Sequence, residues 1–206
     1  MSNFSARLKA SGRIKVDNHA RAMPNKVELR KRVLAEVPAP VFDAFAGSGQ
    51  MFRRVWRDAP GYVGCDLRWF PDERMAYVAD NKRVLRSIDL GGFGIFDLDA
   101  YGSPWEQALI IAGRRIVKPG ERIGFCITEG SSLKLRMGQP AKAMTLMAGM
   151  TNKAVGVSSQ QDELTARAIA GLAQRMRCAV LKSWMARGKS GAQVRYYGLV
   201  FEGVMV

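Results

Sequence analysis

The stretch VFDAFAGSG, residues 41–49, reads as a buried strand that ends in a glycine-rich turn. Apolar residues at helical spacing follow it, namely Met51, Phe52, Val55 and Trp56. Glycine lets a backbone turn tightly and approach a ligand, and a helix N-terminus offers free N–H groups to an anion. A dinucleotide-binding turn would follow G-x-G-x-x-G, but residue 52 is Phe, which argues against a tight pyrophosphate turn.

Strand and helix patterns alternate along the rest of the chain. The further strands are expected at 61–66, 77–80, 94–99, 122–128, 178–186 and 193–201. Helices are expected after Asn25, where Glu28 completes a capping box, after Trp105, and after a capping pattern from Ser158 to Gln161. This alternation predicts an α/β fold with a mostly parallel, Rossmann-like sheet. The turn at 187–191 predicts a C-terminal hairpin that adds an antiparallel strand.

The charge of the chain is strongly positive. Its 32 Lys and Arg residues outnumber 18 Asp and Glu residues, which gives +14 over 206 residues. Such an excess attracts polyanions, so nucleic acid, RNA or DNA, is the first candidate partner. A basic surface that only keeps the protein soluble is the alternative. No apolar run approaches the roughly 20 residues of a membrane span. The first residues lack the apolar core of a secretory signal, so a cytoplasmic protein without a membrane partner is expected.

The sequence divides into two parts. Residues 1–36 form a basic N-terminal arm and a helix, and residues 37–206 form the main domain. We expect Arg13, Lys15 and Arg21 of the arm to contact substrate phosphates. Residues 131–157 interrupt the alternation and hold four Met and four Lys or Arg residues. They are either a short helix whose Met side chains fill the core or a substrate-facing insertion after the fifth strand. The sequence does not indicate an oligomeric state.

The cysteines and the histidine argue against two kinds of chemistry. Cys65, Cys126 and Cys178 each lie in an apolar run, and no C-x-x-C pair exists. Buried, inert thiols are therefore expected, with neither a disulfide framework nor a metal site. A Ser-His-Asp or Cys-His mechanism would depend on the single histidine, His19.

Carboxylates stand at the ends of three successive strands. Asp43 precedes the glycine turn, Asp66 ends the second strand, and Asp80 followed by Asn81 ends the third. Open α/β sheets bind ligands at the carboxyl ends of their strands. Asp66 is placed to accept hydrogen bonds from both ribose hydroxyls, and Asp80 from an adenine amino group. The alternative is that these Asp residues cap the helices that follow.

The fourth strand ends in the richest cluster of polar and aromatic residues, FDLDAYGSPW, residues 96–105. Strand alternation puts Asp97 and Asp99 on one face. Asp99, with a backbone carbonyl, would accept hydrogen bonds from an exocyclic amine, Asp97 would support it, and Tyr101 would stack on the base. Ordinary loop chemistry could also explain the turn. The remaining residues expected to contact substrate are Ser103, Pro104 and Trp105.

These motifs resemble a known family. Residues 41–130 resemble a class I S-adenosylmethionine-dependent methyltransferase. VFDAFAGSGQ is similar to the Asp-Pro-Phe-Ala-Gly-Ser-Gly motif of amino-methylating DNA methyltransferases. DLDAYGSP, residues 97–104, resembles the Asp-Leu-Asp-Pro-Phe-Gly-Ser-Pro motif of tRNA guanine N2-dimethyltransferases and matches it at six of eight places.

The resemblance implies a seven-stranded sheet, S-adenosyl-L-methionine as cofactor, methyl transfer to an exocyclic amine of a nucleic-acid base, and no metal. The catalytic residues would be Asp99, Asp97 and Tyr101. The cofactor would contact Asp43, Phe45, Gly47, Ser48, Gly49, Asp66, Leu67, Asp80 and Asn81. Ala100 stands where the tRNA motif, and also the Asp-Pro-Pro-Tyr motif of DNA methyltransferases, has Pro, which leaves the target atom open. The alternative is a nucleic-acid-binding protein without activity on a decayed methyltransferase fold.

Overall fold

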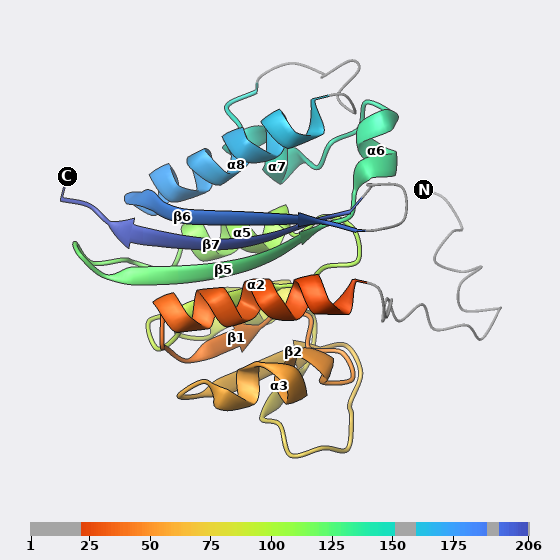
Figure 1. The fold of residues 1–206 in the computed structure, drawn as a ribbon, viewed down its shortest axis with the longest axis vertical. Helices are drawn as coiled ribbons and strands as arrows, with labels where there is room; N and C mark the ends of the chain where they lie inside the picture. Colours follow the sequence, from red (N-terminus) through yellow and green to blue (C-terminus); the bar gives the residue numbers. More distant parts are fainter. Residues whose placement is uncertain (1–21, 151–159, 189–193, 206) are drawn as a thin grey trace.

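The computed structural model describes residues 22–150, 160–188 and 194–205, and within them it contains one seven-stranded sheet. The strand order is β3-β2-β1-β4-β5-β7-β6 (Figure 1). The strands are β1 (Val41–Asp43), β2 (Tyr62–Asp66), β3 (Ala76–Val78), β4 (Ile95–Leu98), β5 (Arg122–Glu129), β6 (Cys178–Arg187) and β7 (Arg195–Gly203). β1 to β5 are parallel, and β7 pairs antiparallel with β5 and β6. The predicted fold class is confirmed.

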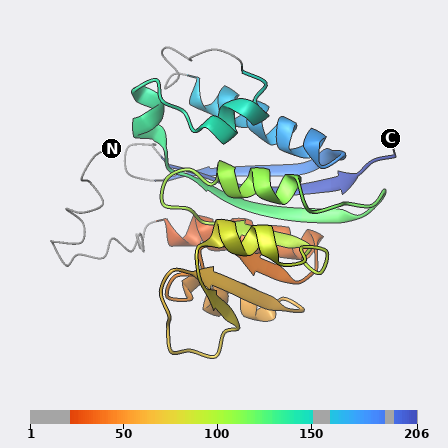
Figure 2. The same cartoon turned by 180° about the vertical axis from the view of Figure 1, so that it is seen from behind.

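Helices cover both faces of the sheet (Figures 1 and 2). One face carries α2 (Met23–Glu36), α3 (Gln50–Arg54) and the 3-10 turn η1 (Trp56–Asp58). The other carries α4 (Asn81–Ser87), α5 (Trp105–Ala112), α7 (Lys142–Met147) and α8 (Gln161–Arg175). The short α6 (Ser132–Arg136) follows β5.

The period of two along each strand sorts the core into two layers. In β4, Ile95 packs with the α2 and α3 cluster, whereas Phe96 and Leu98 pack with the α5 and α8 cluster. Asp97 therefore shares the α2 face with Ile95, and Asp43, its neighbour across the β1–β4 pair, lies on the same face. The sheet thus places two neighbouring carboxylates, Asp43 and Asp97, on the face that α2 and α3 cover.

Two glycines let α2 lie close against the sheet. A Cβ built on Gly124 of β5 would meet Val33 Cγ1 at 2.5 Å, and one on Gly198 of β7 would meet the Leu29 carbonyl oxygen at 3.2 Å. Val33 is fully buried. The helix predicted with the N-terminal arm is therefore packed into the same layered unit as the rest of the chain.

Two helix starts differ from the sequence prediction. The residue before α2 is Ala22, which makes no side-chain cap, and Asn25 instead donates to the Arg187 carbonyl. α8 begins after Gln160 without a side-chain cap, and Ser158 lies outside the described residues. The short α4 was not predicted, since it buries only Val84 and Leu85 and gives too little periodicity.

The sequence left open whether the Met residues of the segment after β5 fill the core or face outward, and the described part of the segment contains both kinds. Met144 and Met147 of α7 are buried in the core, and α7 packs so closely on α8 that Gly171 leaves no room for a Cβ beside Met147. Met137, by contrast, is 63% exposed. Residues 151–157 lie outside the described ranges.

The three cysteines are free and buried, as predicted. No cluster of His, Cys, Asp and Glu suited to a metal ion occurs among the residues that the structure describes. In the same residues, none of the helices is long and apolar enough to cross a membrane.

Candidate active site

The predicted site residues meet at the carboxyl edge of the parallel strands. β1 lies between β2 and β4, so the chain order reverses on its two sides. A crevice opens at such a point in open α/β sheets, and ligands bind there. The glycine turn after β1, Asp66 at the end of β2 and Asp99 after β4 all lie at this edge.

The glycine turn is clamped by side chains from the next strand and loop. Gly47 and Gly49 have φ values of +47° and +77°, which side chains rarely adopt. Asp66 accepts from the Gly47 N–H at 2.9 Å and from the Arg68 N–H at 2.9 Å. Arg74 donates to the carbonyls of Ala46 and Gly47 at 3.0 and 2.9 Å.

The same turn is closed on one side and open on the other. A Cβ at Gly49 would lie 2.8 Å from the Arg74 guanidinium carbon. Among the described residues, a Cβ at Gly47 would come within 4 Å of the Phe45 carbonyl oxygen alone, at 3.8 Å. The backbone at Gly47 therefore leaves space that a ligand would fill.

Asp43 lies beneath the turn and is buried. It accepts from the Phe45 N–H at 3.1 Å and from the Tyr62 hydroxyl at 3.0 Å. Burial, together with the charge of Asp97, raises the pKa of Asp43 to about 8. Its contacts make Asp43 a support of the turn.

Asp80 and Asn81 hold the start of α4. Asp80 accepts from the N–H groups of Lys82 and Arg83, which is the capping role considered above. Asn81 donates to the Ala44 carbonyl at 2.7 Å and accepts from Gln107 at 3.0 Å. These bonds tie α4 and α5 to the end of β1. Leu67, directly after Asp66, is 75% exposed.

Asp97 forms a buried ion pair with α2. Its two oxygens accept from Arg30 Nη2 and Nε, each at 2.6 Å, and the Trp56 indole N–H donates at 2.7 Å. Asp97 has no exposed surface, and Arg30 is 2% exposed. Burial raises the pKa of Asp97 above its ordinary value, while Arg30 opposes that shift. Asp97 positions its neighbours and does not face solvent.

Asp99 is also engaged by α2. Lys26 Nζ donates to both Asp99 oxygens, at 2.9 and 3.0 Å, and Thr128 Oγ1 donates at 2.7 Å. Arg30 Nη2 lies 3.3 Å from Asp99 Oδ2. Burial alone would raise the pKa of Asp99, but the charges of Arg30 and Lys26 outweigh it and hold that pKa below its ordinary value. Asp99 is therefore an ionised carboxylate with its acceptor sites filled.

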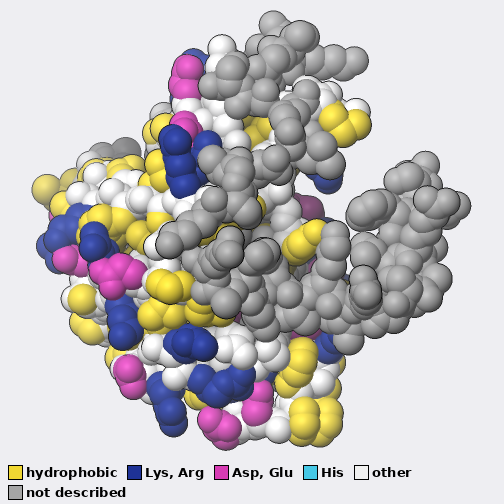
Figure 3. All heavy atoms as spheres, turned by 45° about the vertical axis from the view of Figure 1, so that its right-hand side comes forward, with side chains coloured by type: hydrophobic (Ala, Val, Ile, Leu, Met, Phe, Trp, Pro, Cys, Tyr) yellow, Lys and Arg dark blue, Asp and Glu magenta, His cyan; other side chains and the backbone are white. Residues whose placement is uncertain are grey.

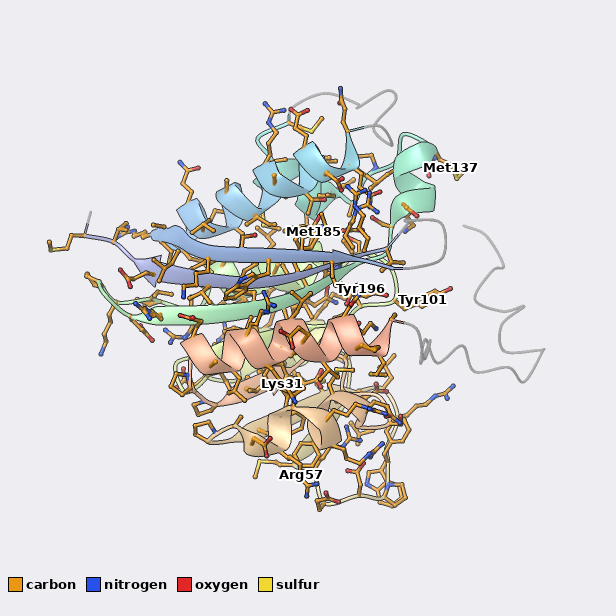
Figure 4. The ribbon with its side chains drawn as sticks, viewed as in Figure 1. Lys31, Arg57, Tyr101, Met137, Met185 and Tyr196 are labelled. Carbon is orange, nitrogen blue, oxygen red and sulfur yellow. The ribbon has the colours of Figure 1, made fainter. Side chains whose placement is uncertain are left out.

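The rest of the predicted motif divides into exposed and buried residues. Tyr101 is 69% exposed and points outward beyond the carboxyl edge of the sheet (Figure 4). Pro104 caps α5, and the buried Oγ of Ser103 has no hydrogen-bond partner within the described residues. Trp105 corrects a prediction: it is fully buried and donates its indole N–H to Glu129 at 2.5 Å, so it does not face a substrate.

Sequence reasoning missed Lys26, Arg30, Thr128 and Arg74. Lys26 and Arg30 are four residues apart and continue, through Val33 and Val37, one face of α2. A basic pair on an apolar helix stripe was the available signal. Arg13, Lys15 and Arg21 lie outside the described residues.

The seven-stranded sheet, its antiparallel strand β7 and the glycine turn after β1 together define the class I S-adenosylmethionine-dependent methyltransferase fold. Trm1 from Pyrococcus horikoshii, solved in complex with S-adenosyl-L-methionine, is similar with a TM-score of 0.61 and 14% identity over 92% of this chain. This chain spans 57% of that one.

Two further structures share the fold. The N-methyltransferase NodS from Bradyrhizobium japonicum WM9, in complex with S-adenosyl-L-homocysteine, gives a TM-score of 0.56 at 10% identity, covering 98% of this chain and 99% of NodS. The 1,6-didemethyltoxoflavin-N1-methyltransferase from Burkholderia thailandensis gives 0.51 at 13% identity, covering 98% and 86%. No protein-family model and no curated protein matches the sequence.

Proposed function

We propose that this protein methylates an exocyclic amine of a nucleic-acid base, RNA in preference to DNA, with S-adenosyl-L-methionine as methyl donor. One observation carries the proposal: Asp99, at the carboxyl edge of the sheet, already accepts N–H hydrogen bonds at both of its oxygens, from the ammonium group of Lys26. A carboxylate that orients one amine at this position is suited to orient another.

The residues around the glycine turn fit the cofactor. The open backbone at Gly47 leaves room for its amino-acid part, and Asp66 on the next strand offers carboxylate oxygens to the ribose hydroxyls. Asp80, Asn81 and the exposed Leu67 would border the adenine. When bound, the cofactor supplies an electrophilic methyl group on its sulfonium.

Asp99 would receive the acceptor amine in exchange for Lys26. The carboxylate would accept a hydrogen bond from the substrate N–H and so fix the direction of the nitrogen lone pair, while Thr128 and Arg30 continue to hold the carboxylate. The exposed Tyr101 would stack on the base. Correct orientation of two reactants alone can give effective molarities of about 10⁵ M or more.

Charge supports a nucleic-acid substrate. The chain carries +14, and in Figure 3 Lys and Arg side chains lie among apolar and acidic ones over the lower half of the molecule, where Figure 1 places β2 and α3. Arg13, Lys15 and Arg21 of the arm are proposed phosphate contacts. Polyanion binding of this kind is strongly salt-dependent.

The test is transfer of a tritiated methyl group to total tRNA, ribosomal RNA and genomic DNA in parallel. We expect label in an RNA fraction, and nucleoside digestion of that fraction should place it on an exocyclic nitrogen. Label in none of the three fractions, with cofactor bound, would refute a nucleic-acid substrate.

A second function, nucleic-acid binding without catalysis, is favoured by one observation. Lys26, Thr128 and Arg30 together fill the acceptor sites of Asp99, whose side chain is only 16% exposed. Calorimetric titration with S-adenosyl-L-methionine separates the two functions. Binding supports the methyltransferase, and absence of binding by the folded protein supports the second function.

A further inference from the structure

The loop between β2 and β3 holds large apolar side chains on the surface beside the glycine turn. Leu67 is 75% exposed, and Trp69 and Met75 are each 71% exposed. Tyr77 and Val78 of the neighbouring strand β3 are 43% and 51% exposed and, as consecutive strand residues, lie on its two opposite faces. We call these five residues, together with Arg68, the 67–78 surface. Large apolar side chains that are exposed together in one short segment mark a candidate interaction site.

The loop is held in place by a buried side chain. Arg74, whose side chain is 2% exposed, pairs with Asp72 at 2.7 Å and donates to the carbonyls of Ala46 and Gly47. Its guanidinium also lies 5.9 Å from the centre of the Phe70 ring. Arg74 therefore fixes the position of the loop, and in that fixed position Trp69 stays exposed.

The surface adjoins the candidate active site. β3 is the terminal strand of the sheet, and Val78 pairs with Asp66 in the β2–β3 register. Leu67 follows Asp66 directly. A polymer seated on the 67–78 surface would therefore run along the same edge as the glycine turn.

Basic residues flank the surface on both sides. α3 and η1 contribute Arg53, Arg54 and Arg57 against Asp58, and α4 contributes Lys82, Arg83 and Arg86 with no acidic residue. Glu106 pairs with Lys82 and Arg86, and the loop itself carries Asp72, which pairs with Arg74, and Glu73. Exposed aromatic rings between basic flanks match the stacking and phosphate contacts of single-stranded nucleic acid. Two copies of this chain would instead bring like-charged flanks together.

We propose that the 67–78 surface binds a single-stranded segment of nucleic acid, with bases stacked on Trp69 and Tyr77 and phosphates held by the flanking arginines. The proposal rests on the proposed function for the identity of the polymer, and it adds a second contact area beyond the proposed acceptor site at Asp99.

The test compares oligonucleotide binding by Trp69→Ala, Trp69→Phe and the unchanged protein. The probe is a fluorescently labelled single strand of about 12 nucleotides, within the usual site size, made as RNA and as DNA. Loss of one base–aromatic stack should weaken binding of the RNA strand by about 5- to 150-fold in Trp69→Ala. Trp69→Phe should retain most of the affinity, since stacking needs only a ring.

The matched control is Ile116→Ala. Ile116 is 83% exposed and precedes β5, so it lies at the amino ends of the parallel strands, away from the glycine turn. It should bind the strand as the unchanged protein does. If Trp69→Ala and Ile116→Ala bind the strand with equal affinity, the inference is wrong. The proposed function is tested separately, by methyl transfer, and does not depend on that result.

Two other outcomes also decide the matter. If Trp69→Ala weakens S-adenosyl-L-methionine in calorimetry but leaves the strand bound normally, Trp69 covers the cofactor and the inference is wrong. If the protein transfers no methyl group yet loses strand affinity in Trp69→Ala, the surface stands and the proposed function fails.

Discussion

The buried pair of Arg30 and Asp97 gives the most direct test of how α2 is held on the sheet. Arg30→Met leaves the Asp97 carboxylate, which has no exposed surface, with one hydrogen-bond donor among the described residues, the Trp56 indole N–H. Removing one member of a buried ion pair costs about 3–5 kcal/mol. For a chain of this size each kcal/mol shifts Tm by roughly 2–4 °C, so Tm should fall by about 6–20 °C.

Urea and thermal unfolding, followed by circular dichroism, measure the effect. The matched control is Arg32→Met on the same helix, whose pair with Glu28 is exposed and worth at most about 0.5 kcal/mol. In Arg30→Met/Asp97→Leu neither charge remains, and the cost should shrink to that of the unpaired Trp56 N–H, about 1–3 kcal/mol. A loss below about 1 kcal/mol in Arg30→Met, or a double variant whose loss equals the sum of the two single losses, would refute the reasoning.

Four further outcomes are expected. Asp66→Ala should weaken S-adenosyl-L-methionine at least about tenfold in calorimetry, since two charge-assisted hydrogen bonds to the ribose are lost. Asp99→Ala should cut turnover by about two orders of magnitude, with cofactor affinity changed only a few-fold. Burial and Asp97 raise the pKa of Asp43 to about 8, so the folded state holds a proton that the unfolded carboxyl, with a pKa near 3.9, has released. Stability to urea should therefore fall as pH rises from about 4 to about 8, and Asp43→Asn should flatten that slope. Lys26→Met should lower the KM of the acceptor by about tenfold, because exchange no longer breaks a charge-assisted hydrogen bond of roughly 1.5–3 kcal/mol.

Local patterns predicted the sheet but not its polar contacts. Each strand carries its own period of two and ends in a turn residue, so β1, β2 and β4 were predicted within a few residues of their observed bounds. α4 was missed because Asp80 caps a helix too short to show an apolar stripe. A capping box at Asn25 was wrong, since that side chain reaches the Arg187 carbonyl 162 positions away.

The candidate site shows the same division. Asp97 and Asp99 were correctly expected on one face, because alternation is a local property. Their partners were not, since Arg30 is 67 and Lys26 is 73 positions away along the chain. The prediction that Trp105 contacts substrate was wrong for a related reason. Its indole N–H donates to Glu129 inside the protein, which makes burial of the ring favourable.

The Lys26–Asp99 contact decides between the two candidate functions through the sign of one effect. If Asp99 orients a substrate amine, Lys26 competes with that amine for the same oxygens, so Lys26→Met should strengthen acceptor binding. If the contact is only structural, the same variant leaves Asp99 with Thr128 and Arg30 and should lower stability without any gain in binding. Lys26 lies in the first turn of α2, directly after the basic arm.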